Sequence, residues 1–258
     1  MSLQKMRIFN ANAIKIIAAI AMVIDHIGLL FFPYNLFYRA IGRISMPLFS
    51  FALAEGCRYT KNKAKHFFFL FTLATAFQIV YTIATGDFYL NILLTFSMSV
   101  LAIYALQFFK TELFKDGRKR SRIILSGGLF VAVIAGIYAI CNVFTKMLPY
   151  TVDYGFLGCM LPVFASLLDF HRIPAPEVLQ KTDRLPLRVL CLGIGLLLFF
   201  LFTATSHPMR PILPYAFLSL LFLLLYNGEK GKRNMKYFFY IFYPSHLLLL
   251  YGLAILIF

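Results

Sequence analysis

Long apolar runs alternate with short polar segments from residue 11 to residue 257. About 20 consecutive apolar residues are enough for an α-helix to cross the hydrocarbon core of a bilayer. The pattern predicts nine spans, and because the sixth and eighth are short, eight or ten remain open. The predicted spans are about 11–32, 36–56, 66–85, 88–109, 122–145, 154–170, 186–205, 211–226 and 236–257.

Basic residues are distributed unevenly between the two sets of loops. The N-terminal tail and alternate loops, near 58–65, 110–122, 172–188 and 230–236, hold 20 of the 25 Lys and Arg residues, and the opposite loops hold two. Cytoplasmic loops of membrane proteins carry an excess of Lys and Arg. The distribution therefore predicts a cytoplasmic N-terminus, and it explains the net charge of +15 without a nucleic-acid partner.

Composition agrees with a membrane protein, since 61% of the residues are hydrophobic and 14% are charged. Soluble domains have about 25% charged residues. We interpret the chain as an all-α integral membrane protein, a multispanning helical bundle that forms one domain over residues 1–258. The lipid bilayer is its first partner, and we expect multi-pass insertion in the bacterial cytoplasmic (inner) membrane.

Ionisable residues interrupt the first two apolar runs. Lys15, Asp25 and His26 lie in the first run, and Arg39 and Arg43 lie in the second. A charged residue at the centre of a spanning helix costs about 2.5–3.5 kcal/mol on insertion scales, so such residues pair, line polar cavities or take part in chemistry. These five residues are the first candidates for a functional site.

Helical geometry divides these candidates between faces. Eleven residues at 100° each return to within about 20° of the start, so Lys15 and His26 share a face, with His26 about 16 Å further outward. Asp25 points about 80° away from Lys15 and is expected to meet another neighbour. Arg39 and Arg43, four residues apart, lie on one side of the second span. They could simply neutralise Asp25, or their excess charge could suit an anionic ligand or a developing oxyanion.

Further polar residues fall in the outer half of the predicted bundle. Asn91 and Thr95 lie on the fourth span, and Asp153 and Tyr154 begin the sixth, where Asp153 is expected to be the helix N-cap. His246 lies near mid-depth in the last span, after a Tyr-Pro pair. A buried histidine can be a hydrogen-bonded core residue or a catalytic group, and both interpretations stay open for His246.

Short motifs of this chain resemble, in the same order, those of the TraX family. They are M-V-I-D-H-I-G (Met22–Gly28), R-x-I-G-R (Arg39–Arg43) with P-L-F (Pro47–Phe49), A-E-G-x-x-Y-T (Ala54–Thr60), N-I-L-L-T (Asn91–Thr95), D-Y-G-x-x-G (Asp153–Gly158) and Y-P-x-H-L (Tyr243–Leu247). The resemblance extends from about residue 10 to the end, although 110–150 and 171–240 show no family signature.

The TraX family comprises multispanning acyltransferases, and its founding member is associated with acetylation of the N-terminal amine of conjugative pilin. The family resembles a wider superfamily of transmembrane acyltransferases. Members of that superfamily carry a basic residue and a histidine eleven apart on the first helix, and an arginine before a P-L-F-F-like run. His26 and Arg43 fit directly, whereas Lys15 stands where arginine is more usual. Lysine keeps the charge but loses the bidentate fork.

The resemblance implies an acyltransferase that moves an acetyl group from cytoplasmic acetyl-CoA to an amine or hydroxyl. The acceptor, a peptide, glycan or lipid, would arrive from the outer side. The expected catalytic residues are His26, Asp25, Arg43 and His246. Donor binding is expected from Lys15, Arg39 and Arg58, and acceptor binding from Asn91, Thr95, Asp153 and Tyr154. Whether His26 acts as a general base or itself becomes acetylated is left open by the sequence.

Two other classes of protein compete with the enzyme. A proton-coupled transporter would also bury ionisable residues, and a non-catalytic membrane assembly factor would not need His26. No metal site is expected, because the adjacent Asp25 and His26 point about 100° apart on a helix. The four cysteines are scattered without C-x-x-C spacing, which predicts free thiols.

Overall fold

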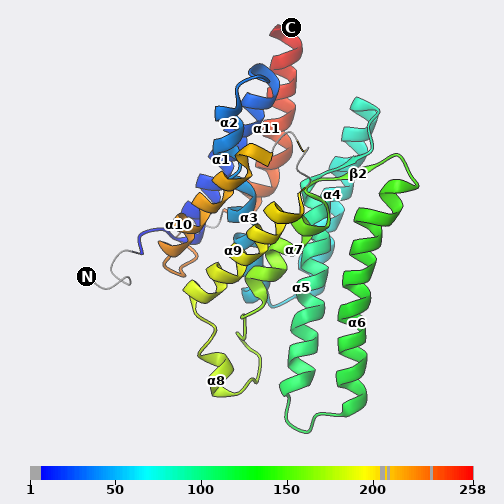
Figure 1. The fold of residues 1–258 in the computed structure, drawn as a ribbon, viewed down its shortest axis with the longest axis vertical. Coiled ribbons are helices and arrows are strands. Elements are labelled where there is room, and N and C mark those ends of the chain that lie inside the picture. The colour runs from blue at the N-terminus through cyan, green and yellow to red at the C-terminus, as the bar shows by residue number, and fades with distance from the viewer. Residues whose placement is uncertain (1–6, 204–206, 208–209, 233–234, 258) are drawn as a thin grey trace. The chain divides into compact units, whose positions relative to one another are not determined.

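The computed structural model describes residues 7–203, 207, 210–232 and 235–257. These residues are mostly helical (Figure 1). The helices are α1 (Ala11–Phe31), α2 (Leu36–Gly42), α3 (Ser45–Tyr59), α4 (Lys63–Thr85), α5 (Ile92–Phe114), α6 (Arg120–Tyr138), the π-helix η2 (Ala139–Val143), the 3-10 helix η3 (Phe144–Lys146), α7 (Gly155–Ser166), α8 (Glu177–Gln180), α9 (Leu185–Phe202), the 3-10 helix η4 (Arg210–Phe217), α10 (Leu218–Leu224) and α11 (Lys236–Ile257). Two short strands are β1 (Tyr89–Leu90) and β2 (Thr151–Val152).

The chain divides into two compact units, and α3 and α9 each contribute to both. The first unit comprises Met1–Ala52 and Leu196–Phe258, and the second comprises Leu53–Gly195. Each unit has its own buried apolar residues, such as Ala18 and Leu48 in the first and Val100 and Ile103 in the second. The expectation of one domain over residues 1–258 stays a prediction.

Among the described residues, five helices are long and apolar enough to cross a membrane. They are Ala11–Phe31, Lys63–Thr85, Ile92–Phe114, Arg120–Lys146 and Leu185–Phe202. Three shorter apolar helices are Gly155–Ser166, Arg210–Leu224 and Ile241–Ile257. The predicted class of all-α membrane protein is supported, while the count of nine spans and the cytoplasmic N-terminus stay predictions.

The second predicted span, 36–56, is two helices rather than one. α2 ends at Gly42, and α3 begins at Ser45 after a turn in which the Arg43 amide bonds to the Ala40 carbonyl at 3.2 Å. Pro47 explains the break, because an uninterrupted helix would bring its ring against the carbonyl of Arg43. In the first turn of α3 the missing N–H of Pro47 costs nothing.

The eighth predicted span, 211–226, also differs from an α-helix. Its first part is the 3-10 helix η4, with Pro211 and Pro214, and the seven-residue α10 follows. Proline removes an amide donor and disfavours the α conformation of the residue before it. Two prolines three residues apart therefore prevent an α-helix until Leu218.

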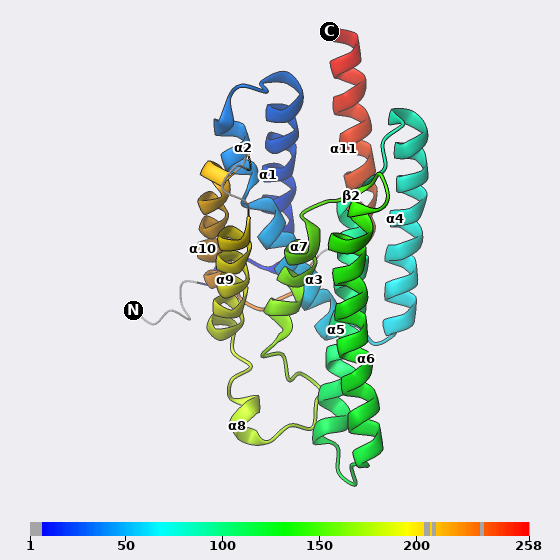
Figure 2. The same cartoon turned by 45° about the vertical axis from the view of Figure 1, so that its right-hand side comes forward.

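In the second unit, α5 and α6 lie side by side in both views (Figures 1 and 2). β1 pairs in parallel with β2, so the segment after α4 meets the segment before α7. Tyr89 lies opposite Thr151 in this pairing. β2 lies in a predicted outer loop, whereas β1 lies within the outer end of the predicted fourth span, 88–109, because α5 begins only at Ile92. The pairing of these two segments at one end agrees with the alternation of basic and non-basic loops.

In the first unit, α1 packs against α2 and α11. The segment before α1 pairs with the segment before α11, since Phe9 donates to Leu225 at 3.1 Å and accepts from Asn227 at 2.8 Å. The N-terminal tail and the loop near 230–236 were both predicted to be cytoplasmic. Their contact therefore agrees with the alternating pattern of the loops.

Candidate functional site

Asp25 of α1 lies between the two arginines of the second apolar run. Its Oδ2 is 2.6 Å from Nη1 of Arg39, and its Oδ1 is 2.8 Å from Nη2 of Arg43. Asp25 is 8% exposed and Arg43 is 7% exposed. The expectation that Asp25 meets a neighbour other than Lys15 is confirmed. One carboxylate facing two guanidinium groups leaves one positive charge in excess.

The close approach of α1 and α2 depends on two glycines. A Cβ at Gly42 would lie 2.1 Å from Oδ1 of Asp25, and a Cβ at Gly28 would lie 2.4 Å from Cβ of Tyr38. Real side-chain carbons do not come this close. The G in the R-x-I-G-R motif therefore makes room for the Asp25 carboxylate between the two arginines.

His26 lies beside His246 of α11, with ring centroids 5.1 Å apart and ring planes at 74°. Nδ1 of His26 is 2.8 Å from the carbonyl oxygen of Met22, and Nδ1 of His246 is 3.0 Å from that of Phe242. A carbonyl oxygen can only accept, so Nδ1 carries the proton in both rings. In the neutral imidazoles, both Nε2 atoms are therefore unprotonated.

Lys15 also faces α11, because its Nζ lies 5.7 Å from the ring centroid of Phe239. The two contacts, Lys15 with Phe239 and His26 with His246, follow the same order along both helices, so α1 and α11 run in the same direction. Parallel spans require an odd number of crossings between them, and the nine-span prediction has seven. The described residues include no carboxylate paired with Lys15.

Two of the predicted acceptor-binding residues, Asn91 and Thr95, hold elements of the second unit together. Asn91 is the N-cap of α5, and its Nδ2 donates to Gln78 Oε1 at 2.8 Å. Thr95 Oγ1 donates to the carbonyl of Asp153 at 2.9 Å. These bonds account for the polarity of the N-I-L-L-T motif, and contact with an acceptor stays a prediction.

The prediction that Asp153 caps α7 is wrong. Its Oδ1 accepts a hydrogen bond of 2.6 Å from the hydroxyl of Tyr89. The N-cap position belongs to Tyr154, which has a left-handed backbone with φ of 58° and makes no side-chain cap bond. Asp153 and Tyr154 lie on the loop fixed by the β1–β2 pair, and their roles toward an acceptor remain predictions.

Arg58, expected to bind the donor, is held by two carboxylates of the second unit. Its Nη1 lies 2.9 Å from Asp169 Oδ1 and 2.5 Å from Asp183 Oδ1. Burial alone would lower the pKa of the Arg58 guanidinium, but the hydrogen bond to Asp183 and the charges of Asp169, Asp183 and Glu55 hold it above its ordinary value. A role in donor binding stays a prediction, and these ion pairs count against it.

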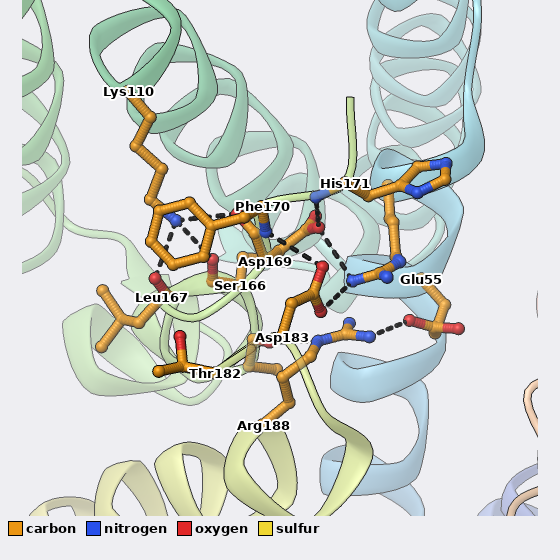
Figure 3. Close-up of polar contacts among 12 residues, drawn as sticks. Glu55, Lys110, Ser166, Leu167, Asp169, Phe170, His171, Thr182, Asp183 and Arg188 are labelled. Atoms are coloured by element: carbon orange, nitrogen blue, oxygen red, sulfur yellow. Dashed lines mark hydrogen bonds and ion pairs between the residues drawn. The ribbon is translucent and has the colours of Figure 1, made fainter. Parts of the chain in front are cut away.

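The surroundings of Arg58 form a network that the sequence analysis missed (Figure 3). Arg188 pairs with Glu55 at 2.5 Å, and Asp183 also accepts from the backbone amide of Phe170 at 3.1 Å. Lys110 Nζ donates to three carbonyls at the end of α7, those of Ser166 at 3.1 Å, Leu167 at 2.7 Å and Asp169 at 3.0 Å. The sequence contained one indication of this network. The chain has only ten acidic residues, yet Glu55, Asp169 and Asp183 all lie at the cytoplasmic side of the predicted spans.

This network, defined as Glu55, Arg58, Lys110, Asp169, Asp183 and Arg188, is balanced in charge, with three cations and three anions. The cluster of Asp25, Arg39 and Arg43 is not balanced, because two cations face one anion. The network thus has the charge balance of a structural element, whereas this cluster has one positive charge to spare for an anion.

The four cysteines are free, as expected. Two of them, Cys141 of η2 and Cys159 of α7, lie with their sulfurs 4.0 Å apart. The sequence spacing gave no indication of this proximity.

The fold and the buried polar groups are those of an α-helical membrane protein with an aspartate–arginine cluster and adjacent histidines on apolar helices. The family model described as TraX protein matches residues 10–254. The chain belongs to the TraX family, which confirms the assignment made from the motifs.

Two relatives extend this comparison. A probable fimbrial assembly protein, FimC of serogroup H1, from Dichelobacter nodosus is 28% identical over 264 residues, which cover 94% of this chain and 94% of that protein. An uncharacterized protein of Rickettsia prowazekii (strain Madrid E) is 35% identical over 107 residues, 41% of each chain. No solved structure matches the chain.

Proposed function

We propose that this protein is a membrane-embedded acyltransferase of the bacterial cytoplasmic membrane. It transfers an acetyl group from acetyl-CoA to an amine or hydroxyl of a peptide, glycan or lipid acceptor. The observation that carries the proposal is the tautomer of His26. Because Nδ1 donates to Met22, Nε2 of the neutral ring is free to take the proton of an attacking amine or hydroxyl.

The charges around His26 suit this chemistry. Asp25 precedes His26 in α1, and the arginines bound to Asp25 supply one more positive charge than it neutralises. Negative charge develops on the carbonyl oxygen of the acyl group during transfer, and fixed cations near that oxygen lower the barrier. We assign this role to Arg43, supported by Arg39.

The residues of the first unit also fit an anionic donor. Lys15 lies on α1 without a carboxylate partner among the described residues, and the charge of Lys230 lies close enough to repel it. Two like charges near each other are stabilised by a bound anion, and the phosphates of acetyl-CoA are such an anion. The donor supplies an activated thioester, and Lys15 would hold its phosphates.

The relative from Dichelobacter nodosus bears the name of a fimbrial assembly protein, and it is similar over nearly the whole chain. That name favours a peptide acceptor, a fimbrial or pilin subunit delivered at the outer side of the membrane. Asn91 and Thr95 bond to other parts of the fold, so the proposal does not depend on them.

Acetyl transfer is tested with the purified chain in detergent and radiolabelled acetyl-CoA. Wild type is compared with His26→Ala and with His207→Ala, a change at an exposed histidine. We expect release of free thiol, or acetyl label on the protein, in wild type and His207→Ala but not in His26→Ala. Label held on His26 would identify a covalent intermediate, and thiol release without label would identify a general base.

A second candidate function is that of a non-catalytic assembly factor, which the name of the same relative favours. It predicts that fimbrial or pilin assembly in a host strain survives His26→Ala. The enzyme predicts that this variant fails to acetylate the subunit while remaining in the membrane. Absence of donor binding and thiol release by wild type would reject the acyltransferase and leave the assembly factor.

A further inference from the structure

His246 keeps a buried nitrogen without a hydrogen-bond donor. The residue is 8% exposed, and its Nδ1 donates to the Phe242 carbonyl. Its Nε2 has no hydrogen-bond partner among the described residues. A buried acceptor without a donor is unfavourable, and native proteins rarely keep one without a reason.

The imidazole ring of His246 makes an edge contact with the ring of His26. The other aromatic neighbours of His246 are on its own helix: Phe242 stacks on it at 5.0 Å, and Tyr243 lies at 5.8 Å. In the neutral state His26 cannot donate to His246, because its single N–H points to the Met22 carbonyl. No hydrogen bond can therefore form between the two neutral rings.

The situation changes when His26 is protonated. Its Nε2 then becomes an N–H donor, in a ring that already contacts His246. We propose that His246 is a positioning residue whose Nε2 accepts a hydrogen bond from Nε2 of His26 only when His26 carries a proton. The proposal rests on the acyltransferase function and assigns a role to the second histidine.

The step that uses this bond is the transfer of one proton. The acceptor's N–H or O–H bond breaks, its proton goes to Nε2 of His26, and its electron pair forms the new bond to the acyl carbon. The carbon–sulfur bond of the thioester breaks with its electron pair going to sulfur, and sulfur takes the proton from His26. His26 is an imidazolium only between these two events, and His246 stabilises it there. An interaction present only on the way to the transition state raises the turnover rate rather than substrate affinity.

The test measures the chemical reactivity of His26, so it needs neither acetyl-CoA nor the molecule that receives the acetyl group. Diethyl pyrocarbonate acylates the unprotonated imidazole, and peptide mass spectrometry gives the extent at each histidine. The samples are full-length wild type, His246→Phe and His246→Gln. Phenylalanine keeps an aromatic ring against His26 but has no hydrogen-bond acceptor. Glutamine restores a hydrogen-bond acceptor through its side-chain carbonyl. Exposed His207 is the reference within each sample.

When Nε2 of His246 is removed, protonated His26 loses its hydrogen-bond acceptor, and the protonated form becomes less favourable. We expect His26 of His246→Phe to react about threefold faster than wild type at the acidic end of a pH series from about 5 to 8, with no difference near pH 8, where the ring is neutral in both. His246→Gln should lie between the two. Equal reactivity of His246→Phe and wild type throughout the series would overturn the proposal. So would faster reaction at both ends of the series, which would indicate simple opening of the site.

A rate measurement separates this inference from the proposed function. In the thiol-release assay, His246→Phe should lower kcat with KM for acetyl-CoA unchanged, and His246→Gln should recover part of the loss. If wild type releases thiol and His246→Phe matches it, the acyltransferase stands and the role of His246 is rejected. If wild type releases no thiol, the acyltransferase is rejected, while the modification experiment still decides whether His246 bonds to protonated His26.

Discussion

The guanidinium of Arg58 lies 2.9 Å from the carboxylate of Asp169, a residue 111 positions further along the chain. The same nitrogen meets Asp183, and the three side chains are at most 12% exposed. At such burial the attraction is screened less than at the surface. Arg58 thus ties the last turn of α3 to the segment between α7 and α9.

Arg58→Ala should therefore be strongly destabilising. The change leaves two buried carboxylates without their cation, and breaking a buried ion pair costs about 3–5 kcal/mol. Unfolding in detergent, by heat or denaturant, measures the loss. Lys61→Ala is the matched control, because Lys61 is a nearby cation that is exposed, and we expect an effect within about 0.5 kcal/mol. Equal stability of the two variants would mean that the ion pairs contribute nothing.

Lys110 is a second test of the same network. Its three ammonium donors are satisfied by carbonyls at the C-terminal end of α7, and its Nζ lies 4.6 Å from the ring centroid of Phe170. Lys110→Met keeps the aliphatic length but leaves these carbonyls without a donor, at a cost of about 1–3 kcal/mol. The measurement is the unfolding temperature relative to Lys115→Met, an exposed lysine on the following turn. A stabilised Lys110→Met variant would contradict the capping role.

Most of the helices could be predicted from hydropathy, because each apolar run needs about 20 residues to span a bilayer. α4 begins at Lys63, three residues before its predicted start, and α11 has its predicted bounds of 236–257. Two runs failed to form a single α-helix, and both contain prolines. In addition, α5 (Ile92–Phe114) begins four residues and ends five residues later than its predicted span of 88–109. Pro47 divides the second run, and Pro211 with Pro214 turns part of the eighth run into a 3-10 helix. A hydropathy pattern carries no information on the amide hydrogen that proline lacks.

The candidate site was predictable where its residues lie on neighbouring segments. The spacing within R-x-I-G-R predicted that both arginines lie on one side of the helix, and in the structure both form ion pairs with Asp25. The contact of His26 with His246 was not predictable, because 220 positions separate the two and only the packing of α11 on α1 joins them. The partners of Arg58 were missed for the same reason, since Asp169 and Asp183 lie in a loop whose fold the sequence pattern does not reveal.

Gly42→Ala tests the close approach of α2 to α1. The added methyl group would lie 2.1 Å from Oδ1 and 2.3 Å from Cβ of Asp25, so one of the two helices must shift. Forcing extra atoms into a packed site costs about 1–3 kcal/mol. Gly56→Ala in α3 is the control, because nothing lies within 4 Å of its added Cβ. Alanine there should be stabilising by about 0.5–1 kcal/mol. Unfolding curves of both variants in one detergent measure the contrast, and similar effects would contradict it.

Asp25→Asn tests whether the two arginines depend on the charge of the residue between them. Asparagine keeps the size but leaves Arg39 and Arg43 facing each other across a neutral amide, and an uncompensated buried charge costs about 3–5 kcal/mol. Arg39→Gln in the same chain removes one cation, so the double variant should be less destabilised than the two single changes added together. Groups in direct contact are coupled by about 0.5–3 kcal/mol. The four unfolding free energies form a double-mutant cycle. Strict additivity would show that Asp25 and Arg39 do not stabilise each other, despite the 2.6 Å between Oδ2 and Nη1.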